Sequence, residues 1–148
     1  MERKFFPHHK IDLTHRSVAA IVFACYDPRF RQALQDFLRV RFGNDPVDIV
    51  TLAGGARSLA HPDDISHRGS LEQIRVSQEK HHAPLIVPII HAYCARYAEP
   101  RLDSPDQGFQ FAKGEFEAVE KHVRGAGINL PMECYFMTAT GTQQVSVF

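Results

Sequence analysis

Short apolar runs alternate along this chain with stretches in which apolar residues recur at helical spacing. The first run, residues 17–24, contains β-branched residues and predicts a strand that is buried on both faces of a sheet. Runs at 47–52 and 84–90 predict two more strands. Pro88 lies within the third run, and we expect it at an edge, an end or a bulge because proline has no N–H to donate.

Three helices are predicted between and after these strands. The first follows Asp27 and Pro28, which suit an N-cap and a first turn, and its apolar spacing extends over residues 30–41 before Gly43 ends it.

After a polar linker at 61–69, Ser70 and Gln73 have the spacing of a capping box, which predicts a helix from Ser70 to near His81. A third helical stripe covers residues 106–123.

The last apolar runs, 132–137 and 143–148, flank a glycine-containing turn and predict a strand with a C-terminal edge strand or tail. Alternation of strands and helices favours an α/β fold with a mainly parallel sheet flanked by helices. At 148 residues the chain has the length of one domain. We therefore expect an N-terminal arm at 1–16 and one domain at 17–148.

Composition and charge exclude several classes of function. The 17 basic and 17 acidic residues cancel, so no overall field attracts nucleic acid or an anionic membrane. The first 15 residues contain no apolar stretch long enough for a signal peptide or a membrane span. We expect a cytoplasmic protein that binds neither nucleic acid nor membrane.

The chemistry of interest lies in two cysteines and a histidine. Cys25 follows the first predicted strand, while His91 and Cys94 follow the third, and ligands of open α/β sheets collect at the carboxyl ends of strands. Two thiolates and one imidazole suit zinc, and three protein ligands leave a fourth position for water. The alternative for each residue is plain burial, with the histidine hydrogen-bonded inside the core.

The other cysteine and histidines fit simpler roles. Cys134 lies within a predicted strand, where we expect it to pack in the core, and a thiol redox role is disfavoured because no C-x-x-C is present. The pairs at 8–9 and 81–82 have no cysteine or spaced carboxylate beside them, so we interpret them as surface histidines.

Asp27 and Arg29 lie directly after Cys25. Asp27 suits an N-cap at least as well as a catalytic role. Arg29 would oppose the helix dipole in the first turn, so we expect it to pair with Asp27 beside the metal ligands.

These residues resemble the β class of carbonic anhydrases. Residues 25–29, Cys-Tyr-Asp-Pro-Arg, match that family's C-x-D-x-R motif, and residues 91–94, His-Ala-Tyr-Cys, match its H-x-x-C motif. Ala-Gly-Gly at 53–55 is similar to its glycine loop, and Asp-Asp at 63–64 with Arg-Gly-Ser-Leu at 68–71 is similar to the segment that follows. The resemblance covers the chain from about residue 18 to its end.

The resemblance implies Zn²⁺ bound by Cys25, His91 and Cys94, and reversible hydration of CO2 to bicarbonate. It implies that Asp27 accepts a hydrogen bond from the hydroxide at the metal and that Arg29 holds Asp27 off the metal. The glycine loop, Gly54 and Gly55, would line the substrate pocket. A homodimer or a higher even oligomer is implied as well.

Some positions depart from the family pattern. Ala95 replaces the usual glycine after the second cysteine, Thr51 and Leu52 replace the usual Arg-Asn before the glycine loop, and Tyr26 is bulkier than the common residue. These positions surround the ligands and set their orientation. They leave open a second hypothesis, a zinc-binding domain of this family without catalysis that has a regulatory or binding role.

Overall fold

A computed structural model describes residues 3–148, and its centre is one five-stranded sheet. The order of strands across the sheet is β2-β1-β3-β4-β5, with β1 to β4 parallel and β5 antiparallel to β4. The strands are β1 (Ile21–Cys25), β2 (Asp48–Leu52), β3 (Ile86–His91), β4 (Glu133–Met137) and β5 (Thr142–Val147). The predicted α/β class, the mainly parallel sheet and the C-terminal edge strand are confirmed.

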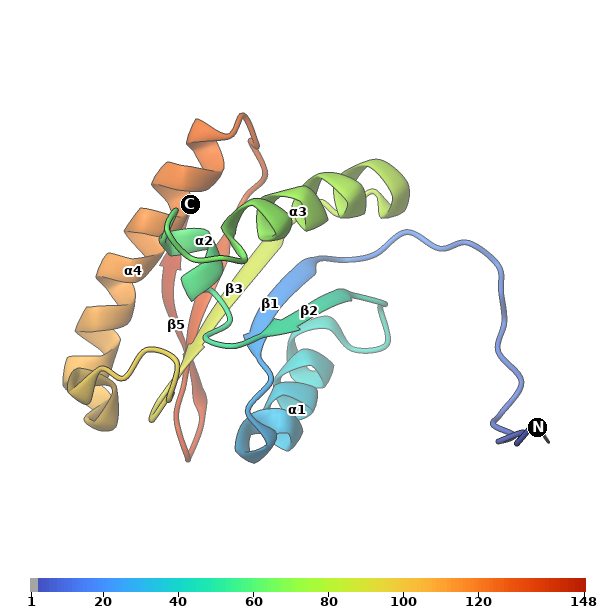
Figure 1. Ribbon diagram of the computed structural model, residues 1–148, viewed down its shortest axis with the longest axis horizontal. Helices are drawn as coiled ribbons and strands as arrows, with labels where there is room; N and C mark the ends of the chain where they lie inside the picture. The colour runs from blue at the N-terminus through green and yellow to red at the C-terminus, as the bar shows by residue number, and fades with distance from the viewer. Residues whose placement is uncertain (1–2) are drawn as a thin grey trace.

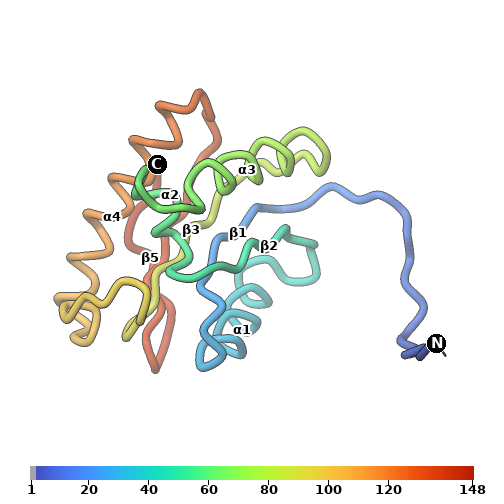
Figure 2. The backbone as a smooth tube through the Cα atoms, viewed as in Figure 1, coloured from blue at the N-terminus to red at the C-terminus, as the bar shows by residue number. Residues whose placement is uncertain are grey.

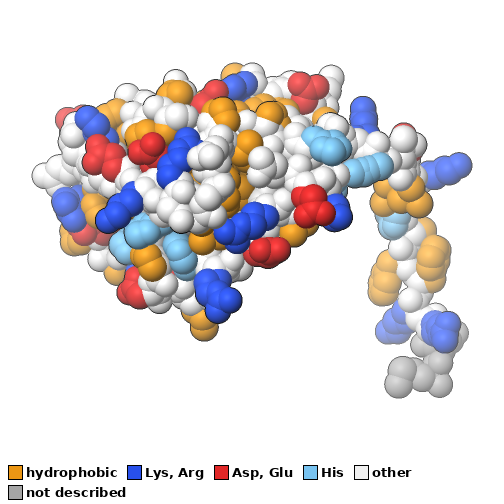
Figure 3. All heavy atoms as spheres, turned by 90° about the horizontal axis from the view of Figure 1, so that it is seen from above, with side chains coloured by type: hydrophobic (Ala, Val, Ile, Leu, Met, Phe, Trp, Pro, Cys, Tyr) orange, Lys and Arg blue, Asp and Glu red, His pale blue; other side chains and the backbone are white. Residues whose placement is uncertain are grey.

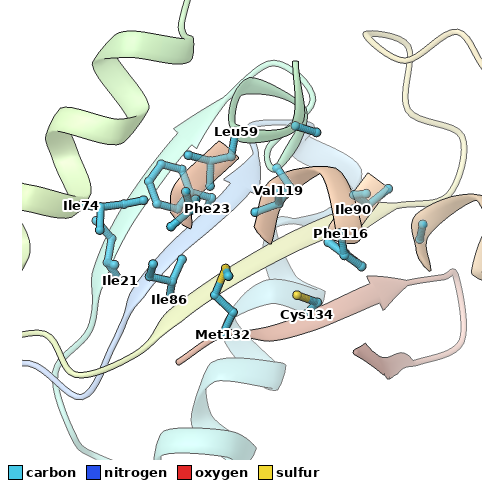
Figure 4. Close-up of a cluster of buried hydrophobic side chains, with 14 of the residues drawn as sticks. Ile21, Phe23, Leu59, Ile74, Ile86, Ile90, Phe116, Val119, Met132 and Cys134 are labelled. Atoms are coloured by element: carbon cyan, nitrogen blue, oxygen red, sulfur yellow. The ribbon is translucent and has the colours of Figure 1, made fainter. Parts of the chain in front are cut away.

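Helices cover both faces of this sheet (Figure 1). The helices are α1 (Arg31–Phe42), α2 (Arg57–Ala60), α3 (His67–His81) and α4 (Pro105–Gly125), with short 3-10 helices η1 (Pro28–Phe30) and η2 (Pro100–Asp103). The larger core cluster packs α2, α3 and α4 against one face, and the smaller packs α1 against the other. In Figure 4, Leu59, Ile74 and Phe116 from these three helices meet side chains of the strands.

β3 is a central strand, which corrects the prediction for Pro88. All six residues of β3 are buried, and it lies between β1 and β4. Pro88 is the register partner of Phe23 on β1. On the β4 side, an isolated bridge joins Ile86 to Met132 and the ladder resumes only at Ile89. The sheet therefore accommodates the missing N–H as an interruption of one ladder inside the strand.

The region after the glycine loop also differs from the prediction. Helix α2 lies in a segment for which no helix was predicted, and α3 begins at His67 rather than Ser70. The predicted capping box is wrong, because Ser70 is buried within α3 and its Oγ lies 2.8 Å from Oγ of Ser58 on α2. A side chain that joins two helices in the interior is unavailable as a cap.

The N-terminal arm projects away from the domain (Figure 2). Residues 3–16 are exposed and belong to neither helix nor strand, while residues 1–2 of the predicted arm lie outside the described residues. Phe5, Phe6 and Leu13 are exposed, and Figure 3 shows hydrophobic and basic side chains along the arm. Among the helices described here, none has the length and apolar character needed to cross a membrane.

Candidate metal centre

The sheet brings three candidate ligands together at its carboxyl edge. Cys25 ends β1 and His91 ends β3, and these strands are parallel neighbours. Cys94 follows three residues later in the turn after β3. One ligand atom from each residue lies within 4.8 Å of the others, and no other group of three such residues meets this criterion within 3–148.

His91 is held with one ring nitrogen free. Its Nδ1 donates to the carbonyl oxygen of Ala92 at 2.6 Å, so the proton of a neutral ring lies on Nδ1 and Nε2 carries a lone pair. The His91 side chain is 4% exposed. Within residues 3–148, its Nε2 is the only buried side-chain nitrogen or oxygen that has no hydrogen-bond partner. The Phe30 ring packs against His91, with centroids 4.3 Å apart. This is the arrangement that metal-bound histidines show.

The two thiols beside it differ in character. The pKa of Cys25 is lowered to about 4, chiefly by the Cys94 thiol beside it and then by the His91 side chain and the Gly54 N–H, which lies 3.4 Å from Cys25 Sγ. The pKa of Cys94 is raised, first by the Cys25 sulfur beside it and then by burial. The thiolate form is therefore favoured at Cys25, and the thiolate is the form of cysteine that binds a metal ion.

Asp27 and Arg29 form the expected ion pair. Arg29 Nη2 lies 2.7 Å from Asp27 Oδ2, and its Nε lies 3.1 Å from Oδ1. Asp27 also accepts the Arg29 backbone N–H at 3.0 Å, so it is the N-cap of η1 as well. Arg29 lowers the pKa of Asp27 to about 2.

This ion pair also contacts the metal-ligand turn. Arg29 Nη2 donates to the Tyr93 carbonyl oxygen at 2.9 Å, and Asp27 Oδ2 is 3.9 Å from His91 Nε2. The carboxylate is thus fixed next to the ligand cluster.

The glycine loop crosses the carboxyl ends of β1 and β3. A Cβ on Gly55 would lie 2.7 Å from the Ile89 carbonyl oxygen and 2.8 Å from the Cys25 nitrogen, and its φ is 54°, so a side chain is excluded there. A small apolar cavity lies beside Cys25 and His91, and its other lining residues are Ala24, Phe30, Leu34, Ile89 and Met137. Neither Gly54 nor Gly55 lines it, so their place in a substrate pocket stays a prediction.

Phe30, Leu34 and Met137 are site residues that the sequence did not reveal, because in the sequence they are ordinary core positions. Their helical or strand spacing predicts burial but does not show which buried side chains border the ligand cluster. Cys134 lies on β4 and is fully buried in the larger core cluster, apart from the ligand group.

The three ligand residues fit a zinc ion. Zinc is bound by cysteine sulfur and histidine nitrogen, whereas magnesium and calcium prefer oxygen. The unpartnered Nε2 of His91 lies in a cluster with two sulfurs, and the pKa of the Cys25 sulfur is lowered. This donor set leaves a fourth coordination position for another ligand.

Comparisons with known proteins agree with this geometry. Residues 15–135 match the sequence model of a family described as "Putative carbonic anhydrase". No curated protein sequence matches the chain.

Solved structures of β-carbonic anhydrases share the fold. The structure is similar to β-carbonic anhydrase isoform I of Trichomonas vaginalis, with TM-score 0.61, 15% identity and coverage of 94% of this chain and 87% of that one. A carbonic anhydrase of Streptococcus mutans gives TM-score 0.57, 13% identity and coverage of 94% and 89%. A structure from a study of two tetrameric β-carbonic anhydrases of Sordaria macrospora gives a TM-score of 0.54 at 12% identity. The match covers 90% of this chain and 83% of that one. At these identities the likeness establishes the fold.

Proposed function

Because the chain belongs to the putative carbonic anhydrase family, we propose that it binds one zinc ion through Cys25, His91 and Cys94 and hydrates CO2 reversibly to bicarbonate. The observation that carries this proposal is the buried, unpartnered Nε2 of His91, in a cluster with two cysteine sulfurs. A buried polar atom without a partner costs about 1–3 kcal/mol. A metal ion at this nitrogen would remove that cost.

Bound zinc lowers the pKa of a water at its open position to about 7, which supplies hydroxide for attack on the carbon of CO2. Asp27 is ionised at neutral pH, since its pKa is lowered to about 2 by Arg29, so it accepts and never donates a hydrogen bond. With zinc bound, Asp27 would accept a hydrogen bond from the hydroxide O–H and so orient the oxygen lone pair toward CO2. Arg29 binds both oxygens of Asp27 and keeps the carboxylate in place.

The side chains around Cys25 and His91 suit an uncharged substrate, although the cavity between them has room for only about one water molecule. Its remaining lining consists of the apolar residues Ala24, Phe30, Leu34, Ile89 and Met137. CO2 is linear and carries no charge, so it needs no hydrogen-bond donor to approach the ligands along these side chains.

Elemental analysis and a stopped-flow hydration assay test this function. We expect one zinc per chain in purified protein and none in Cys94→Ser, because a hydroxyl is a poor substitute for a thiolate. Cys134→Ala is the control, since Cys134 lies in the core apart from the ligands, and it should keep its zinc. Folded wild-type protein without zinc would refute the proposal.

Zinc-loaded protein without hydration activity would instead favour the second hypothesis, a zinc domain of this family without catalysis. The observations that favour it are Leu52 and Ala95, which stand where the family usually has asparagine and glycine. Leu52 is the register partner of Cys25 and Ala95 follows Cys94, so both are able to alter the pocket without removing a ligand.

We also propose that the chain assembles as a homodimer or a higher even oligomer. The support is the arm, where Phe5, Phe6 and Leu13 are 86%, 78% and 89% exposed. Burial of such side chains is worth about 1.5–3 kcal/mol each, which favours a partner surface. Light scattering at micromolar concentration tests the assembly, and a strictly monomeric mass would contradict it.

A further inference from the structure

A buried carboxylate lies close to the metal centre without belonging to it. Asp64 is in the segment between α2 and α3, and its side chain is 4% exposed. Its Oδ2 accepts hydrogen bonds from Arg57 Nη1 and, at 3.3 Å, from Arg96 Nη2. Its Oδ1 accepts the Ser66 N–H at 2.9 Å. We call Arg57, Asp64 and Arg96 the carboxylate clamp.

The buried carboxylate of the clamp is stabilised by its partners. Burial by itself would raise the pKa of Asp64, but the Ser66 N–H and the two guanidinium groups outweigh burial, so the pKa is lowered. An ionised carboxylate with a partner for each oxygen is stable in the interior, whereas the loss of that charge leaves two arginines facing each other.

The clamp connects the two loops that surround Cys25 and Cys94. Arg57 begins α2 directly after the glycine loop, and Arg96 lies two residues after Cys94. Gly54 lies against both arginines, since a Cβ there would be 3.0 Å from Arg57 Cβ and 3.1 Å from Arg96 Cγ. Gly54 in turn donates its N–H to Cys25 Sγ at 3.4 Å.

We propose that Asp64 is a positioning residue for the metal centre. By holding Arg57 and Arg96 together, it fixes the glycine loop that donates to Cys25 and the turn that carries Cys94. Groups that orient metal ligands from outside the ligand set raise metal affinity by about 10–100-fold. The effect on zinc rests on the proposed function, while the ordering of the two loops does not.

Asp64→Asn tests the clamp because it keeps the shape of the side chain and removes its charge. Glu133→Gln is the matched control, because it also removes the charge of a carboxylate that pairs with an arginine. Glu133 Oε1 lies 2.7 Å from Arg41 Nη2, and this ion pair is at the other end of the sheet. In metal-free full-length protein we expect amide hydrogen exchange in segments 53–56 and 94–98 to quicken about tenfold in Asp64→Asn. In Glu133→Gln these two segments should exchange as in the wild type.

Zinc affinity, measured by competition with a chromophoric chelator, is the second readout. Asp64→Asn should weaken it about 10–100-fold, and Glu133→Gln should leave it unchanged. If Asp64→Asn loses stability but binds zinc as tightly as the wild type, Asp64 is structural only and the proposal is overturned.

Arg96→Met keeps the test decisive if Asp64→Asn does not fold. Arg96 is 42% exposed, and methionine keeps the carbon stem that lies against Gly54 while removing the guanidinium. It should weaken zinc binding several-fold, and wild-type affinity would overturn the proposal. If the wild type itself takes up no zinc, the proposed function fails, and the exchange of the two segments alone decides for or against the clamp.

Discussion

Two histidines at opposite edges of the sheet show how a candidate metal ligand differs from a structural residue. At the amino edge, His81 Nδ1 lies 2.8 Å from Asp48 Oδ2, and the Ser77 hydroxyl donates to the same oxygen at 2.6 Å. At the carboxyl edge, His91 Nε2 has no hydrogen-bond partner. The His81 side chain is 43% exposed and that of His91 is 4% exposed.

Solvent is available to His81, so its polar atoms are satisfied whether or not Asp48 is present. His91 is enclosed by protein, so its free nitrogen depends on a group that enters the site. The comparison teaches that burial together with a missing partner, rather than the presence of a histidine near polar residues, identifies the candidate metal ligand.

The largest expected effect is the loss of zinc on removing His91. His91→Ala leaves two thiols without the imidazole, and the zinc content should fall from about one per chain to nearly none. His81→Ala is the matched control and should retain the metal. Elemental analysis after dialysis measures both variants. Equal zinc contents in the two would contradict the distinction drawn between these histidines.

The next effect in size concerns Arg29. Without the guanidinium, Asp27 is free to turn toward the metal and become its fourth ligand, so hydration should fall about 100-fold or more in Arg29→Ala while zinc stays bound. X-ray absorption at the zinc edge should show a carboxylate oxygen in place of a water oxygen. An unchanged zinc environment with unchanged activity would show that Arg29 is only the partner of an N-cap.

Asp27 should have a smaller effect. Asp27→Ala leaves the metal accessible but removes the acceptor that orients the hydroxide, so hydration should fall about tenfold. It also removes the cap of η1, which costs about 0.5–2 kcal/mol of unfolding free energy.

Asp27→Asn separates these two roles, because asparagine caps a helix about as well as aspartate. If this variant keeps both wild-type stability and wild-type hydration rate, the charge of Asp27 has no part in the reaction.

The smallest effect belongs to the amino edge. Ser77→Ala removes one donor to Asp48, which still has His81, so the unfolding free energy should fall by about 1 kcal/mol. Thermal unfolding should show a midpoint lower by about 2–4 °C. Zinc content and hydration should stay at the wild-type level, and a change in either would show that the two edges are coupled.

Several features of the fold were predictable because they depend on local pattern. The apolar runs at 47–52 and 84–90 contain β2 and most of β3, and the helical stripe at 106–123 lies within α4. The candidate ligands were predictable because Cys25 and His91 end two parallel strands and Cys94 follows three residues after His91. Local spacing and strand direction are properties of the sequence itself.

Other features depended on which residues meet in space. The sequence predicts Ser70 as part of a helix cap, but in the fold its hydroxyl hydrogen-bonds with the Ser58 hydroxyl in the interior. The sequence predicts Pro88 at an edge, an end or a bulge, but β1 and β4 enclose it, and the ladder with β4 is interrupted beside it. A cap or an edge is defined by its neighbours, and distant segments supply them here.

The sequence by itself determined the α/β class, the strands and the set of residues able to hold zinc, since these follow from periodicity and side-chain chemistry. The tertiary structure decided that His91 is buried with a free nitrogen and that Asp64 holds Arg57 and Arg96 beside Gly54. Burial and charge pairing arise between residues far apart in the chain, so no local pattern specifies them.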